Sequence, residues 1–344
     1  MSTPSSQSAA GIIQFLQRSG AHYRAFDLGS QLRKLSREQF AGFDQGQAYP
    51  YPYLNHAWLI LLLWNPDQHE QHSIWFMKLP LDEQACLPAA VMSDVLDRLH
   101  RSVATPDATE RQRLLTDHPY QFTPSEEKMA ALHARASRTL GRPPSAYHKP
   151  AYRALIDQQQ EPVWEQIGLQ GIYDVLERRS QADEQALAKG LTRLPDVVLH
   201  PLLCALEHHQ PGVVLTDRII ELCRRNTDST THISALRAVS QSPSAGLTEA
   251  FVIDTLDRFT ENLDVVLAVL SRHTKLLSNT ELALVALDRL AVLADADGFN
   301  RVVQGLALQP GLSGLVLQAL RHPHRSEALA KAIGDLIQAS RSVQ

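Results

Sequence analysis

The sequence predicts an α+β N-terminal domain, a small antiparallel sheet with helices, followed by an all-α HEAT-like solenoid, so that the chain is mostly helical overall. The sheet is predicted by two apolar runs, 57–64 and 73–79, on either side of a short polar segment. The solenoid is predicted by a period of 32 residues, because stacked helix pairs repeat at such intervals. The repeated element is a threonine followed by an acid, at Thr216-Asp217, Thr248-Glu249 and Thr280-Glu281.

Composition and charge narrow the class of protein. The chain has 344 residues, enough for two domains, and a formal net charge of −4. That charge creates no strong field for nucleic acid or an anionic membrane. The three cysteines, Cys86, Cys204 and Cys223, form no C-x-x-C pair, which is typical of buried thiols in a reducing compartment.

No segment predicts export or membrane insertion. Residues 1–10 are rich in serine and lack the basic and apolar regions of a signal peptide. The longest apolar run, 57–64, covers eight residues, whereas a helix that spans a bilayer needs about 20. We therefore expect a soluble, cytoplasmic protein that does not contact a membrane.

The N-terminal part alternates helix and strand signals. An apolar helical face at 12–16 predicts a first helix, and the capping box of Ser36 with Gln39 predicts a second one that ends near Phe43. The proline-rich segment 49–53 predicts an extended connector. Strands are predicted at 22–26, 57–64 and 73–79, with a polar hairpin loop at 65–71.

Two helices are predicted after the sheet. The first is periodic over 87–100. The second begins in 123–126, where Thr123 is the expected N-cap, and ends at Leu140 before Gly141. Because 142–145 has two prolines and no apolar residue, we predict a linker there, between a small α/β domain at 1–141 and the solenoid at 147–344.

The solenoid prediction is supported by an aliphatic column that appears when the chain is aligned on the repeated threonine. The alignment includes Asp183 and Ser313, each 33 residues beyond the nearest threonine. The fourth residue after each aligned position is aliphatic: Leu187, Ile220, Val252, Leu284 and Leu317. Partner helices are predicted at 196–208, 230–239, 264–272, 299–308 and 326–339. HEAT-like is the closest description, because the ankyrin and tetratricopeptide signatures are missing from the sequence.

Three stretches resemble an uncharacterised bacterial protein family of unknown function. They are Arg24 to Gly29 (R-A-F-D-L-G), Tyr49 to Pro52 (Y-P-Y-P) and Ile74 to Gln84, which contains W-F-M-K-L-P-L-D-E-Q. The similarity extends over most of the chain. The resemblance implies a bacterial cytoplasmic setting and carries over no catalytic role, cofactor or site residue.

Arginines near the ends of the repeat helices suggest two interpretations. They could form a basic edge that contacts phosphates, with Arg225, Arg258 and Arg289 as its members. Alternatively, each cation complements the C-terminal end of its helix dipole and pairs with an acid four residues earlier. The offsets of the arginines from the aligned threonines vary, which favours the second interpretation.

Candidate site residues in the first domain are polar and aromatic. Arg24, Asp27, Lys78, Asp82 and Glu83 could form a polar site if the strands pair, although no nucleophile accompanies them. The alternative for Asp82 and Glu83 is that they simply begin the next helix. Tyr51 and Trp58 could present an aromatic surface to a partner, or pack the connector against the sheet.

No motif predicts a metal, a nucleotide or a cofactor. His69 and His72 lack the helical spacing and the further ligands of a zinc site. The run Asp295-Ala296-Asp297-Gly298 begins like a calcium loop, but the later ligand positions do not fit.

The favoured function is that of a non-catalytic intracellular scaffold or adaptor, which binds a protein partner along the concave solenoid surface. One alternative is a HEAT-like nucleic-acid-binding protein that uses the arginines. A second is an enzyme with a site in the first domain. The sequence alone leaves all three open, and leans away from an enzyme.

Overall fold

The computed structural model describes residues 11–20, 22–65, 68–105, 107, 110, 113, 117–157 and 167–342. The chain divides into two compact units. The first, called here the sheet unit, runs to Thr123 and includes 308–310, and the second, the helical unit, comprises the rest. A small antiparallel sheet followed by many helices confirms the predicted fold class.

The sheet has four antiparallel strands in the order β2-β1-β3-β4. Their bounds are β1 His22–Asp27, β2 Arg33–Lys34, β3 His56–Asn65 and β4 Gln68–Pro80. The three predicted strands are confirmed, and only the two-residue β2 was missed. The predicted loop at 65–71 is wrong, because β4 already begins at Gln68. Asn65 pairs with Gln68 and Trp64 with His72, so the register shifts within this polar segment, and the ladder bonds on either side of the shift do not require apolar side chains.

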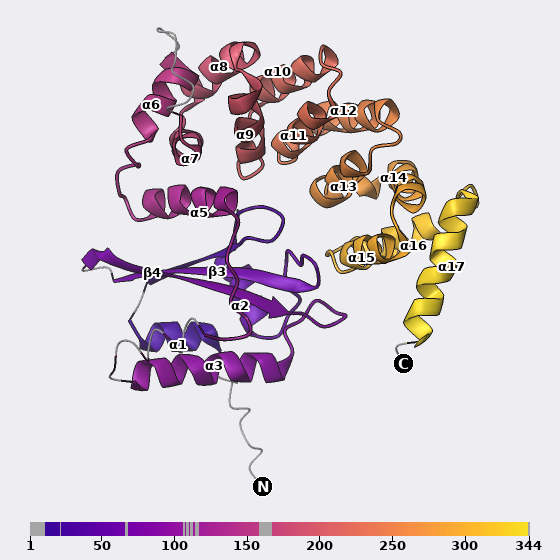
Figure 1. Ribbon diagram of the computed structural model, residues 1–344. Coiled ribbons are helices and arrows are strands. Elements are labelled where there is room, and N and C mark those ends of the chain that lie inside the picture. Colours follow the sequence, from indigo (N-terminus) through magenta and orange to yellow (C-terminus); the bar gives the residue numbers. More distant parts are fainter. Residues whose placement is uncertain are drawn as a thin grey trace. The chain divides into compact units, whose positions relative to one another are not determined.

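Three helices cover one face of the sheet: α1 Ile12–Arg18, α2 Arg37–Asp44 and α3 Ala89–Ala104 (Figure 1). Successive strand residues alternate between faces, and the odd-numbered ones on β3, such as Leu59 and Leu61, lie in the core with these helices. Ser36 and Gln39 form the predicted capping box of α2. The Asp44 carboxylate, at the end of α2, accepts bonds from the first two amides of α1 and joins the two helices.

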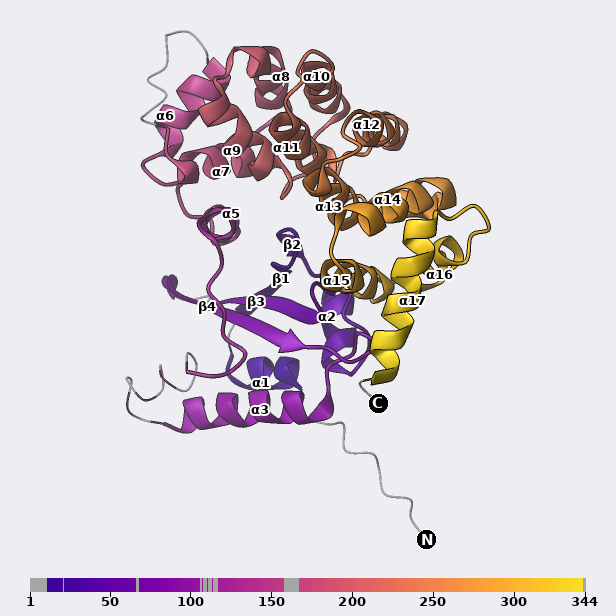
Figure 2. The same ribbon diagram turned by 45° about the vertical axis from the view of Figure 1, so that its right-hand side comes forward.

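The helical unit consists of two rows of helices in an arc (Figures 1 and 2). The inner row contains α5 Glu126–Thr139, α7 Leu169–Arg178, α9 Asp196–Leu206, α11 Ser229–Val239, α13 Leu263–Arg272 and α15 Ala296–Ala307. The outer row contains α6 His148–Tyr152, α8 Gln181–Gly190, α10 Val213–Arg224, α12 Ala245–Arg258, α14 Thr280–Leu293 and α16 Ser313–Leu320. Short turns of other helix types lie at η1 Arg153–Asp157, η3 Leu191–Arg193 and η4 Thr274–Ser278, and α17 Glu327–Ser342 ends the array.

The repeated threonines do not begin their helices, as the sequence suggested, except in α14. Thr216 and Thr248 lie four residues inside α10 and α12, and their buried hydroxyls donate to the carbonyl oxygens of Gly212 and Ser244. Thr280 is the first residue of α14, and Asn279 caps it. Thr216 and Thr248 therefore mark a buried position in their repeats, where the hydroxyl bonds to the preceding turn of its own helix, whereas Thr280 is partly exposed at the start of α14.

The predicted aliphatic column is buried in four repeats and fails in the last. Leu187, Ile220, Val252 and Leu284 are buried, whereas Leu317 is 49% exposed. The reason is the 33-residue step to Ser313, which shifts the alignment by one residue. Val316 takes the buried position in α16, and Leu317 falls on the outer face.

The helix before the predicted linker belongs to the helical unit. Its N-cap is Ser125, two residues later than expected, and its side chain accepts the bond from the Lys128 amide. This helix, α5, packs against α7. The predicted linker at 142–145 lies between α5 and α6, after Gly141 with its positive φ of 67°. None of the described helices is both long and apolar enough to cross a bilayer.

Candidate functional site

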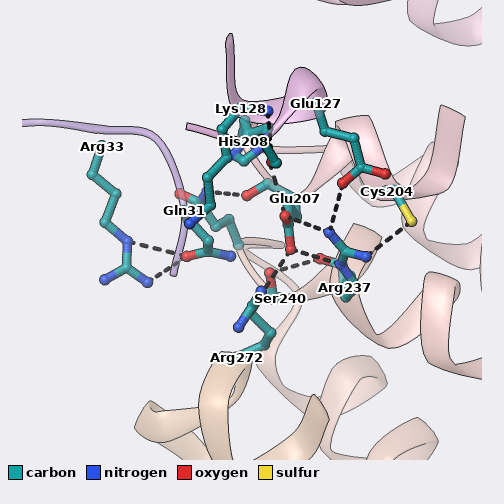
Figure 3. Close-up of polar contacts among 12 residues, drawn as sticks. Gln31, Arg33, Glu127, Lys128, Cys204, Glu207, His208, Arg237, Ser240 and Arg272 are labelled. Atoms are coloured by element: carbon teal, nitrogen blue, oxygen red, sulfur yellow. Dashed lines mark hydrogen bonds and ion pairs between the residues drawn. The ribbon is translucent and has the colours of Figure 1, made fainter. Parts of the chain in front are cut away.

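The most elaborate polar arrangement of the helical unit is centred on Glu207, directly after α9 (Figure 3). Its carboxylate is only 2% exposed. Arg237 of α11 donates to it through Nε at 2.9 Å and Nη2 at 2.8 Å, and Arg272 at the end of α13 donates through Nε at 3.0 Å. One buried acid therefore joins three successive inner helices.

A second buried acid continues this arrangement toward α5. Glu177 of α7 accepts a bond from Arg135 Nε at 2.7 Å, and the Arg138 guanidinium lies 3.5 Å away. We call Arg135, Glu177, Glu207, Arg237 and Arg272 the charge ladder. Each of them lies near the C-terminal end of its inner helix, so the acids and arginines meet at one edge of the row.

Glu207 keeps its charge at neutral pH. Burial alone would raise the pKa of Glu207, but the bond from Arg237 and the charge of Arg272 outweigh it and lower the pKa to about 2. Burial lowers the pKa of the adjacent His208 to about 4, so that this imidazole is neutral. Burial also raises the pKa of the nearby Cys204 thiol.

These ionisation states fit a structural role better than acid–base catalysis. A general acid or base works best with a pKa near the working pH, and Glu207 and His208 are both shifted away from neutrality. A reactive cysteine needs a lowered pKa, and that of Cys204 is raised. We infer that the ladder fixes the angles between inner helices.

The lowered pKa of Glu207 predicts a loss of stability in acid. Because its pKa is about 2 in the folded chain and 4.5 in an unfolded chain, the stabilisation is complete above pH 4.5 and is lost as the pH falls toward 2. Lowering the pH from about 6 to about 3 should cost about 2 kcal/mol through this group. Urea unfolding of wild type and Glu207→Gln at both pH values measures it. The difference in unfolding free energy should shrink by that amount, and an unchanged difference would contradict the assignment.

The polar residues predicted in the sheet unit do not form one cluster. Asp27 is fully buried at the end of β1 and accepts bonds from the Tyr49 hydroxyl at 2.9 Å and the Gly29 amide at 3.2 Å. Arg24 lies three residues earlier and so belongs to the opposite face. Lys78 shares that face, but it is paired with Trp58, four register positions from the level of Arg24.

Asp82 and Glu83 lie in an exposed turn after β4. The Asp82 carboxylate accepts bonds from the amides of Gln84 and Cys86, which closes the turn. They do not begin α3, whose N-cap is Pro88. A pocket in this unit lies between β4 and α3 and is lined by residues that include Trp75, Arg98, His118 and Tyr120, and by none of the predicted polar residues.

The predicted aromatic residues pack mainly within the sheet unit. Tyr51 lies against the core, where its hydroxyl accepts a bond from Gln39 and its ring faces Arg33 at 4.9 Å. The Trp58 indole donates to the Tyr53 carbonyl and packs edge-on against Phe122. The Lys78 ammonium lies 4.8 Å from the Trp58 ring centre.

The three arginines predicted as a basic edge have different environments. Arg225 is 76% exposed and pairs with Glu221, the predicted acid four residues earlier. Arg258 lies over the Phe259 ring. Arg289 is only 19% exposed, because it reaches across to α12 and binds Asp257 at 3.0 Å. Two of the three are therefore neutralised by a carboxylate.

The outer helices carry exposed aliphatic side chains with the repeat spacing. Ile253 of α12, Val285 of α14 and Leu317 of α16 are 42%, 38% and 49% exposed, and they follow each other at steps of 32 residues. Arg289 and Asn279 of the α14 repeat bond to Asp257 and Glu249 of α12, so these helices lie side by side, and α14 packs on α16. We call these three residues the outer aliphatic row.

The described part of the chain contains no candidate metal site. Among the described side chains, no group of three or more His, Cys, Asp or Glu residues is placed to hold an ion. His72 lies on β4 and is exposed, while the side chain of His69 lies outside the described residues. The acids of 295–298 form a helix start, in which Asp295 accepts a bond from the Gly298 amide.

The charge ladder and the outer aliphatic row were both missed in the sequence. A usable signal existed for the ladder: Glu177, Glu207 and Arg237 follow each other at steps of 30 residues, and the last two lie near the ends of predicted partner helices. For the row, the signal was an aliphatic residue next to the column, at Ile253 and Val285. This signal was missed because the sequence alignment assigned Leu317 to the buried column.

Comparison with known proteins gives one match. The profile of a family described as a protein of unknown function (DUF3549) matches residues 8–337. This confirms the predicted resemblance to an uncharacterised family. No curated protein and no solved structure matches the chain significantly.

Proposed function

Since the chain belongs to the DUF3549 family of unknown function, we propose from its own residues that it is a non-catalytic scaffold that binds a protein partner through the helical unit. In this proposal the two helix rows act as a HEAT-like α-solenoid. The sequential contacts of α7, α9, α11 and α13 support it, since each helix packs on the next in the row. Cys86, Cys204 and Cys223 are free thiols, which suits a cytoplasmic setting.

The observation that carries the proposal is the outer aliphatic row. Isolated exposed aliphatic residues are common and need no explanation. Here three of them recur at one repeat position on the outer helices α12, α14 and α16, which distinguishes them from scattered side chains. Such a periodic row suits an apolar partner surface and favours a contact on the outer row, whereas the sequence had suggested the concave side.

A triple substitution tests this role. We expect Ile253→Gln, Val285→Gln and Leu317→Gln together to weaken partner capture by about two orders of magnitude, since each covered aliphatic side chain contributes about 1 kcal/mol. Glutamine keeps the helix propensity and adds no charge. The measurement is capture of bound proteins by the full-length tagged chain, with quantitative mass spectrometry and titration of the main bound protein.

The matched control replaces three other exposed aliphatic residues, Val197, Val213 and Val292, by glutamine. The control should capture the same proteins as wild type, and both variants should show unchanged circular dichroism. Equal capture by wild type and the row variant would remove the outer row from the proposal.

The two alternatives have weaker support in the geometry. For nucleic acid, the ion pairs of Arg225 with Glu221 and Arg289 with Asp257 reduce the positive potential that phosphates require. For an enzyme, Asp27 and Lys78 lie on opposite faces of the sheet, so they do not converge on one substrate position.

A further inference from the structure

We propose that the partner segment which binds the outer aliphatic row is a basic amphipathic helix, recognised by an acid row that runs beside the aliphatic one. This inference rests on the proposed function and adds the chemistry of the partner. The acid row consists of Asp217, Glu249 and Glu281, one on each of the outer helices α10, α12 and α14.

The acid row has the same period as the aliphatic row. Glu249 precedes Ile253 by four residues, and Glu281 precedes Val285 by four. Residues four apart lie on the same helix face, about one turn of 5.4 Å from each other. Each of these two outer helices therefore presents an acid beside an aliphatic side chain, in the same orientation.

The row continues on α10 with a change of chemistry. Asp217 is exposed, but the aliphatic position four residues later is taken by Glu221, which pairs with Arg218 and Arg225. The aliphatic row thus extends from α12 to α16, and the acid row from α10 to α14. The two rows overlap on α12 and α14, where both features are available to one partner.

The acids of the row remain available for charge pairing. The Glu249 carboxylate accepts one bond from the neutral Asn279 amide, and Glu281 lies 3.8 Å from the His322 ring, with its side chain 79% exposed. On the opposite side of the aliphatic row, four residues after its members, lie Asp257, Arg289 and Arg321, and Asp257 and Arg289 neutralise each other. The field beside the row is therefore negative on one flank only, which favours a partner with lysine or arginine on one flank.

The spacing of the helices favours a helical partner. Helices packed side by side lie about 8–10 Å apart, and a helix rises about 1.5 Å per residue. A partner helix that crosses the outer row would meet successive outer helices about every five to seven residues, and at the upper end of this range, close to two turns, its contact residues share one face. Aliphatic residues seven apart, with cations along one side, match both rows.

Designed peptides test the inference on the full-length protein. The probe is an amphipathic helix of about 18 residues with leucines seven apart and lysines on one flank. A second peptide carries glutamates in place of the lysines, and a third carries glutamines in place of the leucines. Fluorescence anisotropy should show binding of the lysine peptide at least about tenfold tighter than of the other two, and weaker at high salt.

Two protein variants test whether the preference for the lysine peptide comes from the acid row. Asp217→Asn with Glu249→Gln and Glu281→Gln should weaken the lysine peptide about tenfold and leave the glutamate peptide unchanged or improved. The glutamine that replaces Glu249 can still accept the bond from Asn279. The control Asp196→Asn with Glu261→Gln and Asp264→Asn removes the same charge from other exposed positions and should bind like wild type.

The outcomes separate this inference from the proposed function. The lysine and glutamate peptides could bind equally well, and both could lose binding when Ile253, Val285 and Leu317 are replaced by glutamine. This result would overturn the basic partner and would support docking on the aliphatic row. The inference would also be overturned if the acid-row variant and its control variant weakened binding of the lysine peptide equally. If no peptide binds the wild-type protein, the inference of a helical partner is wrong. The scaffold function is then tested separately by the capture experiment with the full-length chain.

Discussion

Replacing Glu207 by glutamine is expected to destabilise the helical unit by about 3 kcal/mol. Removal of one partner from a buried ion pair leaves the other charge without compensation, which costs about 3–5 kcal/mol. The lower end applies here, because Arg237 and Arg272 are partly exposed and Glu127 lies 3.6 Å from Arg237. Urea unfolding followed by circular dichroism at 222 nm measures the loss, since most helices belong to this unit.

The control for this change is Glu221→Gln. Glu221 also contacts two arginines, Arg218 and Arg225, but its side chain is 31% exposed and both pairs lie on the surface of α10. Exposed pairs contribute about 0–1 kcal/mol, so this variant should unfold nearly like wild type. Similar losses in both variants would contradict a special role of the charge ladder in joining the inner helices.

Replacing Asp27 by alanine is expected to destabilise the sheet unit by about 3 kcal/mol. The change removes the acceptor of the buried Tyr49 hydroxyl and an acceptor of the Gly29 amide, and loss of the partner of a buried donor costs about 1–3 kcal/mol. Burial, together with the charge of Asp27, holds the pKa of Tyr49 well above its usual range, so this hydroxyl remains a donor. Tryptophan fluorescence during urea unfolding reports on this unit, which contains Trp58, Trp64 and Trp75.

Asp82→Ala is the matched control. Its carboxylate also accepts two amide bonds, from Gln84 and Cys86, but it is exposed and water can replace it. We expect a loss of at most about 1 kcal/mol. If Asp27 and Asp82 behaved alike, the distinction between a buried structural acid and a surface turn would be wrong, and the catalytic hypothesis for Asp27 would regain interest.

Much of the fold could be predicted because its elements follow local patterns. The capping box of Ser36 and Gln39, the apolar run of β3 and the proline-marked ends of the repeat helices depend only on nearby residues. Prediction from local patterns failed where the same short sequence is compatible with two local structures. Thr248 could cap a helix or bond within it, and only the turn beginning at Ser244 decides which.

The candidate sites were harder to predict, because they depend on side chains brought together from distant segments. Glu207, Arg237 and Arg272 span 65 residues of sequence between the first and the last. Nothing near Glu207 distinguishes it from an exposed acid at a helix end. Its burial and its arginine partners arise only when α9, α11 and α13 pack together and bring three helix ends into contact.

The sequence by itself determined the periodic architecture of this protein, because helix length, helix ends and the buried column follow from short-range spacing that repeats about every 32 residues. It also determined the family, since the match runs through residues 8–337. The tertiary structure decided which charges are buried and which aliphatic residues stay exposed. Those properties depend on what each face packs against, and a shift of one residue, as between Val316 and Leu317, exchanges core for surface.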